Sequence, residues 1–533
     1  MAFFKQIARF GCVLGIVAIG IGCVQRTAPV ERTPTMAVQT STPESIGAMI
    51  PVRVSYYPDN YDALYTRLVE EEISIFEIQQ DVQNGCYSYE DLTRFYIDRI
   101  EECENVHAIL SILPNAILRA QDCDKNPGAG SPLYGIPVIL TDSIDAAGAA
   151  STSGAYLLRA RVPEKDAFCL QMLEVAGAIP IAKANLDELN GFVIHYNDGK
   201  ARHGSALGGE PVSPYGNERD VGGSDFGCAM AVTLNLAPLA IGTDTLGSVL
   251  SPAYCNSIVG IRPSHALVSR TGLIPGCVSY DVAGPMAKTV MEAACALYAM
   301  QGSDVEDPFQ SSYQPIDDPL EFLPMAGEGA LIDKRIYIGT GADLLPDGVK
   351  IALETAGATL VTGLSYEPYQ DDPTMQKLGS VPYQYGVRDS INVFLSTAAV
   401  EGVTSVPLLV SYNEKHAAEA IPYGQSHLLH LALLAPMTYE TVDTVDQYLR
   451  VHSIDSFMAK NNLNLILSSN ASITAYGDTP LNPSVSLPMG QREIDGKTSF
   501  VSAVLTARLN EDETAITAAY VLEMLLGSNR VKP

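Results

Sequence analysis

The stretch that decides the fold runs from residue 222 to residue 260 and reads GGSDFGCAMAVTLNLAPLAIGTDTLGSVLSPAYCNSIVG. Two turns rich in glycine and serine, 222–224 and 242–248, flank the apolar segment 229–241. Glycine permits a positive φ and a close backbone approach, so such turns can present N–H groups to an anion. Neither turn ends in Gly-Lys-Ser/Thr, and neither fits a dinucleotide-binding fingerprint. The turns therefore form either one shared anion site or two ordinary tight turns.

Segments typical of helices and strands alternate around this stretch. The apolar periodicity from 61 to 105 is helical, and Ser88 and Asp91 have the spacing of a capping box, which predicts a helix start near Ser88. Short apolar runs at 136–140 and 178–182 predict buried strands. This alternation predicts an α/β fold in which crossover helices cover a central sheet.

The C-terminal half continues the same pattern less regularly. We expect a strand at 335–338 and a helix at 349–356, whereas the segment 368–385 is polar and turn-rich. A loop rich in proline, glycine and acidic residues begins near 308.

The composition is that of a folded, acidic protein. Hydrophobic residues make up 47% of the 533 residues and charged residues 18%, which is typical of a globular chain. The formal net charge is −28. A field of that sign repels nucleic-acid phosphates and anionic lipid headgroups, so neither is expected as a direct partner. The acidity predicts a solvated surface rather than a site for a cationic substrate.

The first residues have the pattern of an export signal. Lys5 and Arg9 precede a mostly apolar stretch, 10–25, which is shorter than the roughly 20 residues of a membrane span. Cys23 follows small residues, as in a bacterial lipoprotein cleavage site. We therefore expect a signal peptide at 1–22, then a Thr/Pro/Ser-rich tether at 23–50. The mature protein is then a membrane-anchored lipoprotein or a secreted or periplasmic protein, and lipidation of Cys23 is its one expected membrane contact.

The remaining cysteines do not predict a metal site. None of them has the C-x-x-C spacing of a zinc cluster, and no metal or other cofactor is expected. Export would permit disulfides, but buried free thiols explain these positions equally well. The eight cysteines after the leader are Cys86, Cys103, Cys123, Cys169, Cys228, Cys255, Cys277 and Cys295.

An ordered set of motifs resembles the amidase signature family, especially its peptide-amidase-type and amidotransferase-type members. The resemblance implies a central mixed β-sheet covered by helices on both faces. It also implies one domain over 51–530, with a variable insert at about 308–460, and an activity that hydrolyses carbon–nitrogen amide bonds. The matching segments are 88–101, 105–108, 132–138, 177–189, 222–229, 236–263, 412–414, 422–425 and 485–490.

The resemblance also implies roles for the two turns. Members of the family use a Ser–cis-Ser–Lys arrangement, in which a base activates a hydroxyl nucleophile. Ser248 matches the nucleophile, and Ser224 matches the bridging serine at the cis peptide bond. The backbone N–H groups of Thr245, Leu246 and Gly247 match the oxyanion hole.

The position of the base departs from the family pattern. The family's GIPVLLKDNID reads GIPVILTDSID at 135–145, so Thr141 stands where the lysine belongs. A threonine hydroxyl has no neutral and charged pair near pH 7 and cannot replace a lysine base. Asp225 replaces a serine, Leu246 replaces a glycine beside the nucleophile, and Leu250 replaces an arginine.

These departures leave two functions open. In the first, the chain is a weak or inactive amidase. If activity remains, the candidates for a substitute base are Lys183, Asp142, Asp225 and His203. Alternatively, it is a non-catalytic envelope-associated protein that binds a small-molecule or peptide amide, or a protein partner. The sequence predicts no oligomeric state.

Overall fold

The computed structural model describes most of the chain after residue 60. The described residues are 61–533, apart from 127, 129, 195–202, 217, 328, 365–372, 399, 436–437, 439, 441–452, 470–480 and 495–496. The expected signal peptide, Cys23 and the tether lie outside these residues. No helix in the described part has the length and hydropathy needed to cross a bilayer.

One mixed sheet organises the described residues. Its eleven strands follow the order β1-β3-β2-β4-β6-β5-β10-β11-β9-β7-β8. Strand β2 is parallel to β3 and β4, and β7 is parallel to β8 and β9, whereas the remaining pairs are antiparallel. The strands are β1 Ile109–Ile112, β2 Pro137–Thr141, β3 Ile179–Ala184, β4 Leu239–Asp244, β5 Val259–Arg262, β6 Val282–Ala287, β7 Arg335–Ile338, β8 Thr359–Val361, β9 Leu465–Ser469, β10 Ser484–Ile494 and β11 Lys497–Ala507.

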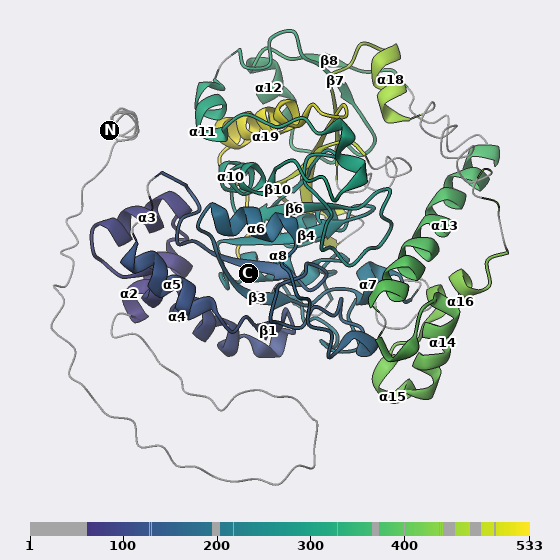
Figure 1. Cartoon of the computed structure of the whole chain (residues 1–533). Coiled ribbons are helices and arrows are strands. Elements are labelled where there is room, and N and C mark those ends of the chain that lie inside the picture. The colour runs from purple at the N-terminus through teal and green to yellow at the C-terminus, as the bar shows by residue number, and fades with distance from the viewer. Residues whose placement is uncertain are drawn as a thin grey trace, which may run out of the picture.

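Helices pack around this sheet in separate groups. Figure 1 shows α2–α5 at one side of the sheet and α13–α16 at the other. The helices are α2 Tyr61–Tyr65, α3 Ile75–Gln83, α4 Tyr89–Glu102, α5 Ala116–Lys125, α6 Phe168–Val175, α7 Glu188–Gly191, α8 Phe226–Thr233, α9 Leu250–Cys255, α10 Val290–Met300, α11 Pro319–Phe322, α12 Asp347–Thr355, α13 Pro373–Ala398, α14 Val406–Lys415, α15 Ala417–Ala420, α16 Ser426–Ala432, α18 Ile454–Lys460 and α19 Asp512–Leu526.

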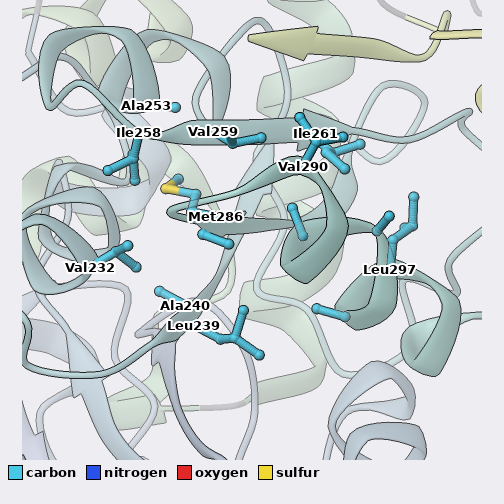
Figure 2. Packing of buried hydrophobic residues seen from close by; sticks show 14 of the residues in the cluster. Val232, Leu239, Ala240, Ala253, Ile258, Val259, Ile261, Met286, Val290 and Leu297 are labelled. Carbon is cyan, nitrogen blue, oxygen red and sulfur yellow. The ribbon is translucent and has the colours of Figure 1, made fainter. Parts of the chain in front are cut away.

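The core lies on both faces of the central strands. Figure 2 shows Val232 of α8 and Ala253 of α9 near Met286 of β6, and Leu297 of α10 at the other end of the cluster. All of these side chains are fully buried. Burying each large one stabilises the fold by about 1.5–3 kcal/mol. The expected α/β architecture, with helices on both faces of a mixed sheet, is confirmed.

Most elements predicted from local pattern are present. The Ser88 hydroxyl accepts from Asp91 N–H and the Asp91 carboxylate accepts from Ser88 N–H, so the capping box forms and starts α4. Strands β2, β3 and β7 and helix α12 lie within two residues of their predicted bounds.

The turn-rich reading of 368–385 was wrong from Pro373 onward, because helix α13 begins there. Its C-terminal part buries Val387, Ile391 and Leu395 in a second apolar cluster with α14 and α16. Tertiary packing of an apolar face stabilises a helix that local propensity does not favour. None of the eight cysteines forms a disulfide in the described structure.

Gly227 provides a test of the packing between α8 and the sheet. A Cβ on this residue would lie 2.3 Å from the Asn185 carbonyl oxygen and 2.4 Å from that of Ala108. Backbone atoms cannot move aside easily, so we expect Gly227→Ala to lower the free energy of unfolding by about 1–3 kcal/mol, despite alanine's better helix propensity. Urea unfolding measures this. Gly327→Ala, where a Cβ meets no atom within 4 Å, should change it by less than about 0.5 kcal/mol. Equal effects of the two changes would refute the packing argument.

Candidate active site

The two glycine- and serine-rich turns meet at one place. The Asp225 N–H donates to the Ser248 carbonyl oxygen at 3.2 Å, which joins the start of α8 to the turn before α9. The peptide bond between Gly223 and Ser224 is cis. The sequence left open a shared site or two separate turns, and the structure brings the turns together.

Thr141 and Asp225 form a hydrogen-bonded pair beside these turns. Thr141 is the last residue of β2, and its hydroxyl donates to one Asp225 carboxylate oxygen at 2.5 Å. The other oxygen accepts from the Thr243 N–H on β4. Both Thr141 and Asp225 are fully buried. Burial raises the pKa of Asp225 to about 7, against the hydrogen bonds from Thr141 and Thr243 that favour its charged form.

The two serines of the site are not hydrogen-bonded to each other. The Ser224 hydroxyl is buried, and it has no hydrogen-bond partner among the described residues. Ser248 is partly exposed, as a nucleophile that meets a ligand must be. In the part of the chain that the structure describes, no base therefore connects to Ser248 through Ser224.

The turn that carries Ser248 is held by Asp244. Its carboxylate accepts from Gly247 N–H at 2.7 Å and from Val249 N–H at 2.8 Å. Asp244 also forms a buried ion pair with Arg262. The Gly247 N–H is thus already engaged, although it was expected to contribute to the oxyanion hole.

Two donors of the expected oxyanion hole stay available. Among the described residues, the backbone N–H groups of Thr245 and Leu246 have no hydrogen-bond acceptor. The Thr245 hydroxyl donates to Asp281 at 2.6 Å, which orients this part of the turn. The Leu246 side chain is half-buried beside the nucleophile. Two adjacent backbone donors can still polarise a carbonyl group.

Lys183 lies on the wrong face of the sheet to serve as a base here. In the parallel pair of β2 and β3, Lys183 is opposite Leu140, and Ala184 is opposite Thr141. Because successive residues on a strand point to opposite faces, Lys183 and Thr141 are separated by the sheet. Lys183 instead pairs with Asp142, its Nζ lying 3.5 Å from a carboxylate oxygen.

The Lys183–Asp142 pair is a closed, buried unit. The lysine also donates to the Ile144 carbonyl and, at 3.1 Å, to the Ser151 hydroxyl. The Asp142 carboxylate accepts from the N–H and hydroxyl of Thr152. Burial lowers the pKa of Lys183 and raises that of Asp142, and their attraction opposes both shifts. Both side chains are engaged within this unit.

His203 is held between two carboxylates. Its Nδ1 lies 3.0 Å from Asp187 and its Nε2 lies 2.8 Å from Asp220. Burial lowers the pKa of His203, but the two carboxylates outweigh burial and raise the pKa to about 10. The ring is therefore an imidazolium near pH 7 and has no lone pair with which to accept a proton.

The sequence did not single out Asn190, which links the site's polar groups. Its side-chain oxygen accepts from the Ser143 hydroxyl at 2.5 Å and from the Thr243 hydroxyl at 3.4 Å. Its amide donates to the Ile274 carbonyl oxygen at 3.0 Å. Asn190 has a left-handed backbone in α7, which asparagine tolerates better than most residues. This tolerance was the one feature of the sequence that could have pointed to Asn190, and it is weak evidence for a role in a site.

No cluster of three or more His, Cys, Asp or Glu side chains with metal-binding geometry occurs among the described residues.

A family model described as "Amidase" matches residues 91–361, which is slightly more than half of the chain. The chain belongs to the amidase family. A putative amidase of Schizosaccharomyces pombe is 30% identical over 372 residues, covering 65% of this chain and 63% of the relative. A glutamyl-tRNA(Gln) amidotransferase subunit from Ralstonia nicotianae is 36% identical over 295 residues, covering 51% of this chain and 57% of the relative. The chain thus spans about three-fifths of the length of these relatives.

A solved peptide amidase extends the similarity to the whole fold. Its crystal structure, in complex with the competitive inhibitor chymostatin, superimposes with a TM-score of 0.77 at 27% identity. The match covers 88% of this chain and all of the peptide amidase. The amidase-signature fold expected from the motifs is therefore confirmed.

The position of His203 gives a prediction for the pH dependence of stability. The folded pKa is raised to about 10, whereas an unfolded histidine titrates near 6.5. The stabilisation that protonated His203 gives the folded state is therefore complete below about pH 6.5, and it is lost as the pH rises through about 10. One pKa unit corresponds to about 1.4 kcal/mol, so His203→Gln should lower the free energy of unfolding by at least that amount at pH 6.

Urea unfolding of the wild type and His203→Gln between pH 6 and pH 10 measures this difference. The gap between the two proteins should shrink as pH rises. A substitution at the exposed His430, to Gln, serves as the control and should leave the profile unchanged. A difference in the free energy of unfolding that is constant over this pH range would show that His203 is not an imidazolium held by the two carboxylates.

Proposed function

We propose that this chain is a non-hydrolysing member of the amidase family that binds an amide or other carbonyl ligand at the turn 245–248. The observation that carries the proposal is the buried hydrogen bond between Thr141 and Asp225. It joins the position of the family's lysine to a carboxylic acid, and no amine among the described residues donates to the bridging serine.

The state of Ser224 supports the same proposal. A buried hydroxyl normally finds a partner, and an exception calls for an explanation. Replacement of the lysine by a threonine explains it, because the shorter side chain turns to Asp225 instead. With no proton acceptor linked to it, Ser248 stays a neutral hydroxyl and a weak nucleophile.

The candidates for a substitute base are each engaged elsewhere. Lys183 and Asp142 pair with one another, and His203 is protonated between two carboxylates. Asp225 has a pKa near neutrality, but its two oxygens accept from Thr141 and Thr243, and no hydrogen bond joins it to the Ser224 hydroxyl. A general base must lie within hydrogen-bond reach of the proton it takes.

Turnover of a chromogenic anilide tests the loss of hydrolysis. We expect very little turnover from the wild type, and little from Thr141→Lys, because the new amine would face Asp225 and stay protonated. The triple variant Thr141→Lys, Asp225→Ser, Leu246→Gly restores the amine, its neutral neighbour and the open turn. Since a general base contributes about 10²–10⁴-fold, its kcat/KM should exceed that of the wild type at least about a hundredfold.

Each of these proteins is compared with its own Ser248→Ala version. Turnover that survives Ser248→Ala comes from a contaminant or from another site. Robust turnover by the unmodified protein that disappears with Ser248→Ala would overturn the proposal and make Asp225 the first candidate for the base.

Ligand binding by the inactive site is tested with chymostatin, the competitive inhibitor bound to the similar peptide amidase. We expect the wild type to bind it, because the Thr245 and Leu246 N–H groups are available to its carbonyl groups. Calorimetry measures the affinity. Absence of both turnover and binding would overturn the proposed ligand-binding role of the turn 245–248.

We further propose that the mature protein is exported and tethered to a membrane through Cys23. The support is the sequence alone: basic Lys5 and Arg9, the short apolar run and the cysteine that follows it. Intact-mass spectrometry of protein from its native host should find a mature terminus at Cys23 with added lipid, in the membrane fraction. An intact Met1 on protein from the soluble fraction would rule this out.

A further inference from the structure

A small cavity separates helix α7 from the loop 421–424, which joins α15 to α16. Its volume is about 10 Å³, which is the space of roughly one water molecule. Glu188 and Asp187 border it on one side, and Tyr423 and Ile421 border it on the other. It is separate from the turn that carries Ser248, which does not line it.

Glu188 has an incomplete set of partners in this cavity. Its side chain is 7% exposed, and one carboxylate oxygen accepts from the Ala206 N–H at 3.1 Å. Among the described residues, no other donor and no cation contacts this carboxyl group. An ionised carboxylate has capacity for about four hydrogen bonds, and the described residues supply one to Glu188.

The burial of Glu188 has a consequence for the charge of its carboxyl group. Burial raises its pKa to about 8, opposed by the Ala206 hydrogen bond. The group is therefore mostly a neutral acid at pH 7. A cation placed beside it would favour ionisation, because an opposite charge within about 4–6 Å offsets the cost of burial.

The surroundings of the cavity favour a cation. Asp187 also borders the cavity, but its carboxylate pairs with His203 and adds little net negative charge there. Burial raises the pKa of Tyr423, and the nearby Glu210 and Glu188 raise it further, so the phenol stays neutral. A neutral tyrosine ring attracts cations through its face. The formal net charge of −28 adds a long-range field of the same sign.

We propose that this cavity binds the primary ammonium group of a ligand, with Glu188 as its counter-ion and Tyr423 beside it. An ammonium group has about the size of a water molecule and fits the volume, and its carbon substituent extends through the open side of the cavity. A guanidinium or a quaternary ammonium group exceeds the volume. On binding, the Glu188 acid loses its proton to solvent and the carboxylate pairs with the ammonium. The site goes beyond the proposed function, because it requires neither Ser248 nor hydrolysis.

Calorimetric titration with methylammonium chloride at pH 7 tests the proposal. Titrations in phosphate and in MOPS, whose ionisation enthalpies differ, give the number of protons released per bound cation. We expect close to one proton, since Glu188 is mostly protonated before binding. Glu188→Gln should weaken binding at least tenfold and abolish the proton release. Guanidinium and tetramethylammonium chlorides should bind at least tenfold more weakly than methylammonium.

Three controls separate this site from other effects. Glu210→Gln changes a neighbouring acid outside the cavity and should retain binding and proton release. Ser248→Ala should do the same, so failure of the proposed function and failure of this site are distinguishable. Thermal unfolding of Glu188→Gln should stay cooperative, because a glutamine has nearly the shape of the neutral acid.

Several outcomes would overturn the proposal. Methylammonium that binds Glu188→Gln as tightly as the wild type would place the cation elsewhere. Binding without proton release, or equal binding of all three cations, would indicate general attraction to an acidic surface. No binding at all would leave the cavity to a water molecule.

Discussion

The buried ion pair between Asp244 and Arg262 is the interaction on which the site depends. Asp244 ends β4 and Arg262 ends β5, and β6 lies between these strands. The arginine also donates to the Asp244 carbonyl oxygen at 3.0 Å and to that of Tyr280 at 2.9 Å. The same carboxylate holds the N–H groups of Gly247 and Val249. Loss of one partner of a buried pair typically costs about 3–5 kcal/mol, so the turn bearing Ser248 is firmly tied to the sheet.

The sheet also keeps two sets of buried ionisable groups apart. Thr141 and Asp225 lie on the face covered by α8 and α9, whereas Lys183 emerges from the opposite face of the neighbouring strand. A shift of one residue in the register of β3 would exchange these faces. The pairing of β2 with β3 therefore decides that the fully buried Lys183 does not reach the site.

Much of this arrangement could be predicted from the sequence, because it depends on interactions between residues that are close together along the chain. The capping box at Ser88 acts within one turn of helix, and buried strands are continuous apolar runs. Glycine-rich turns depend on the conformational freedom of their own residues. The motif comparison placed Thr141 and Asp225 in one site, because both stand at positions with known neighbours in the family.

Other features depend on residues distant in the sequence and could not be predicted. Thr141 and Asp225 are 84 residues apart, and nothing local shows that one donates to the other. Asp244 and Arg262 are 18 residues apart on strands that are not adjacent. The polar start of α13 gave no sign of the apolar cluster that stabilises the helix farther along. Burial of Glu188 likewise follows from the loop 421–424, which reaches it only in the folded chain.

The hydrogen bond between Thr141 and Asp225 also constrains how this site can change over evolutionary time. A lysine introduced at position 141 alone would acquire a buried counter-charge, and a serine introduced at position 225 alone would leave a void and a threonine hydroxyl without its acceptor. The effect of a change at one position therefore depends on the residue at the other, so the two positions are epistatic. A change at position 141 is therefore best accommodated by a matching change at position 225.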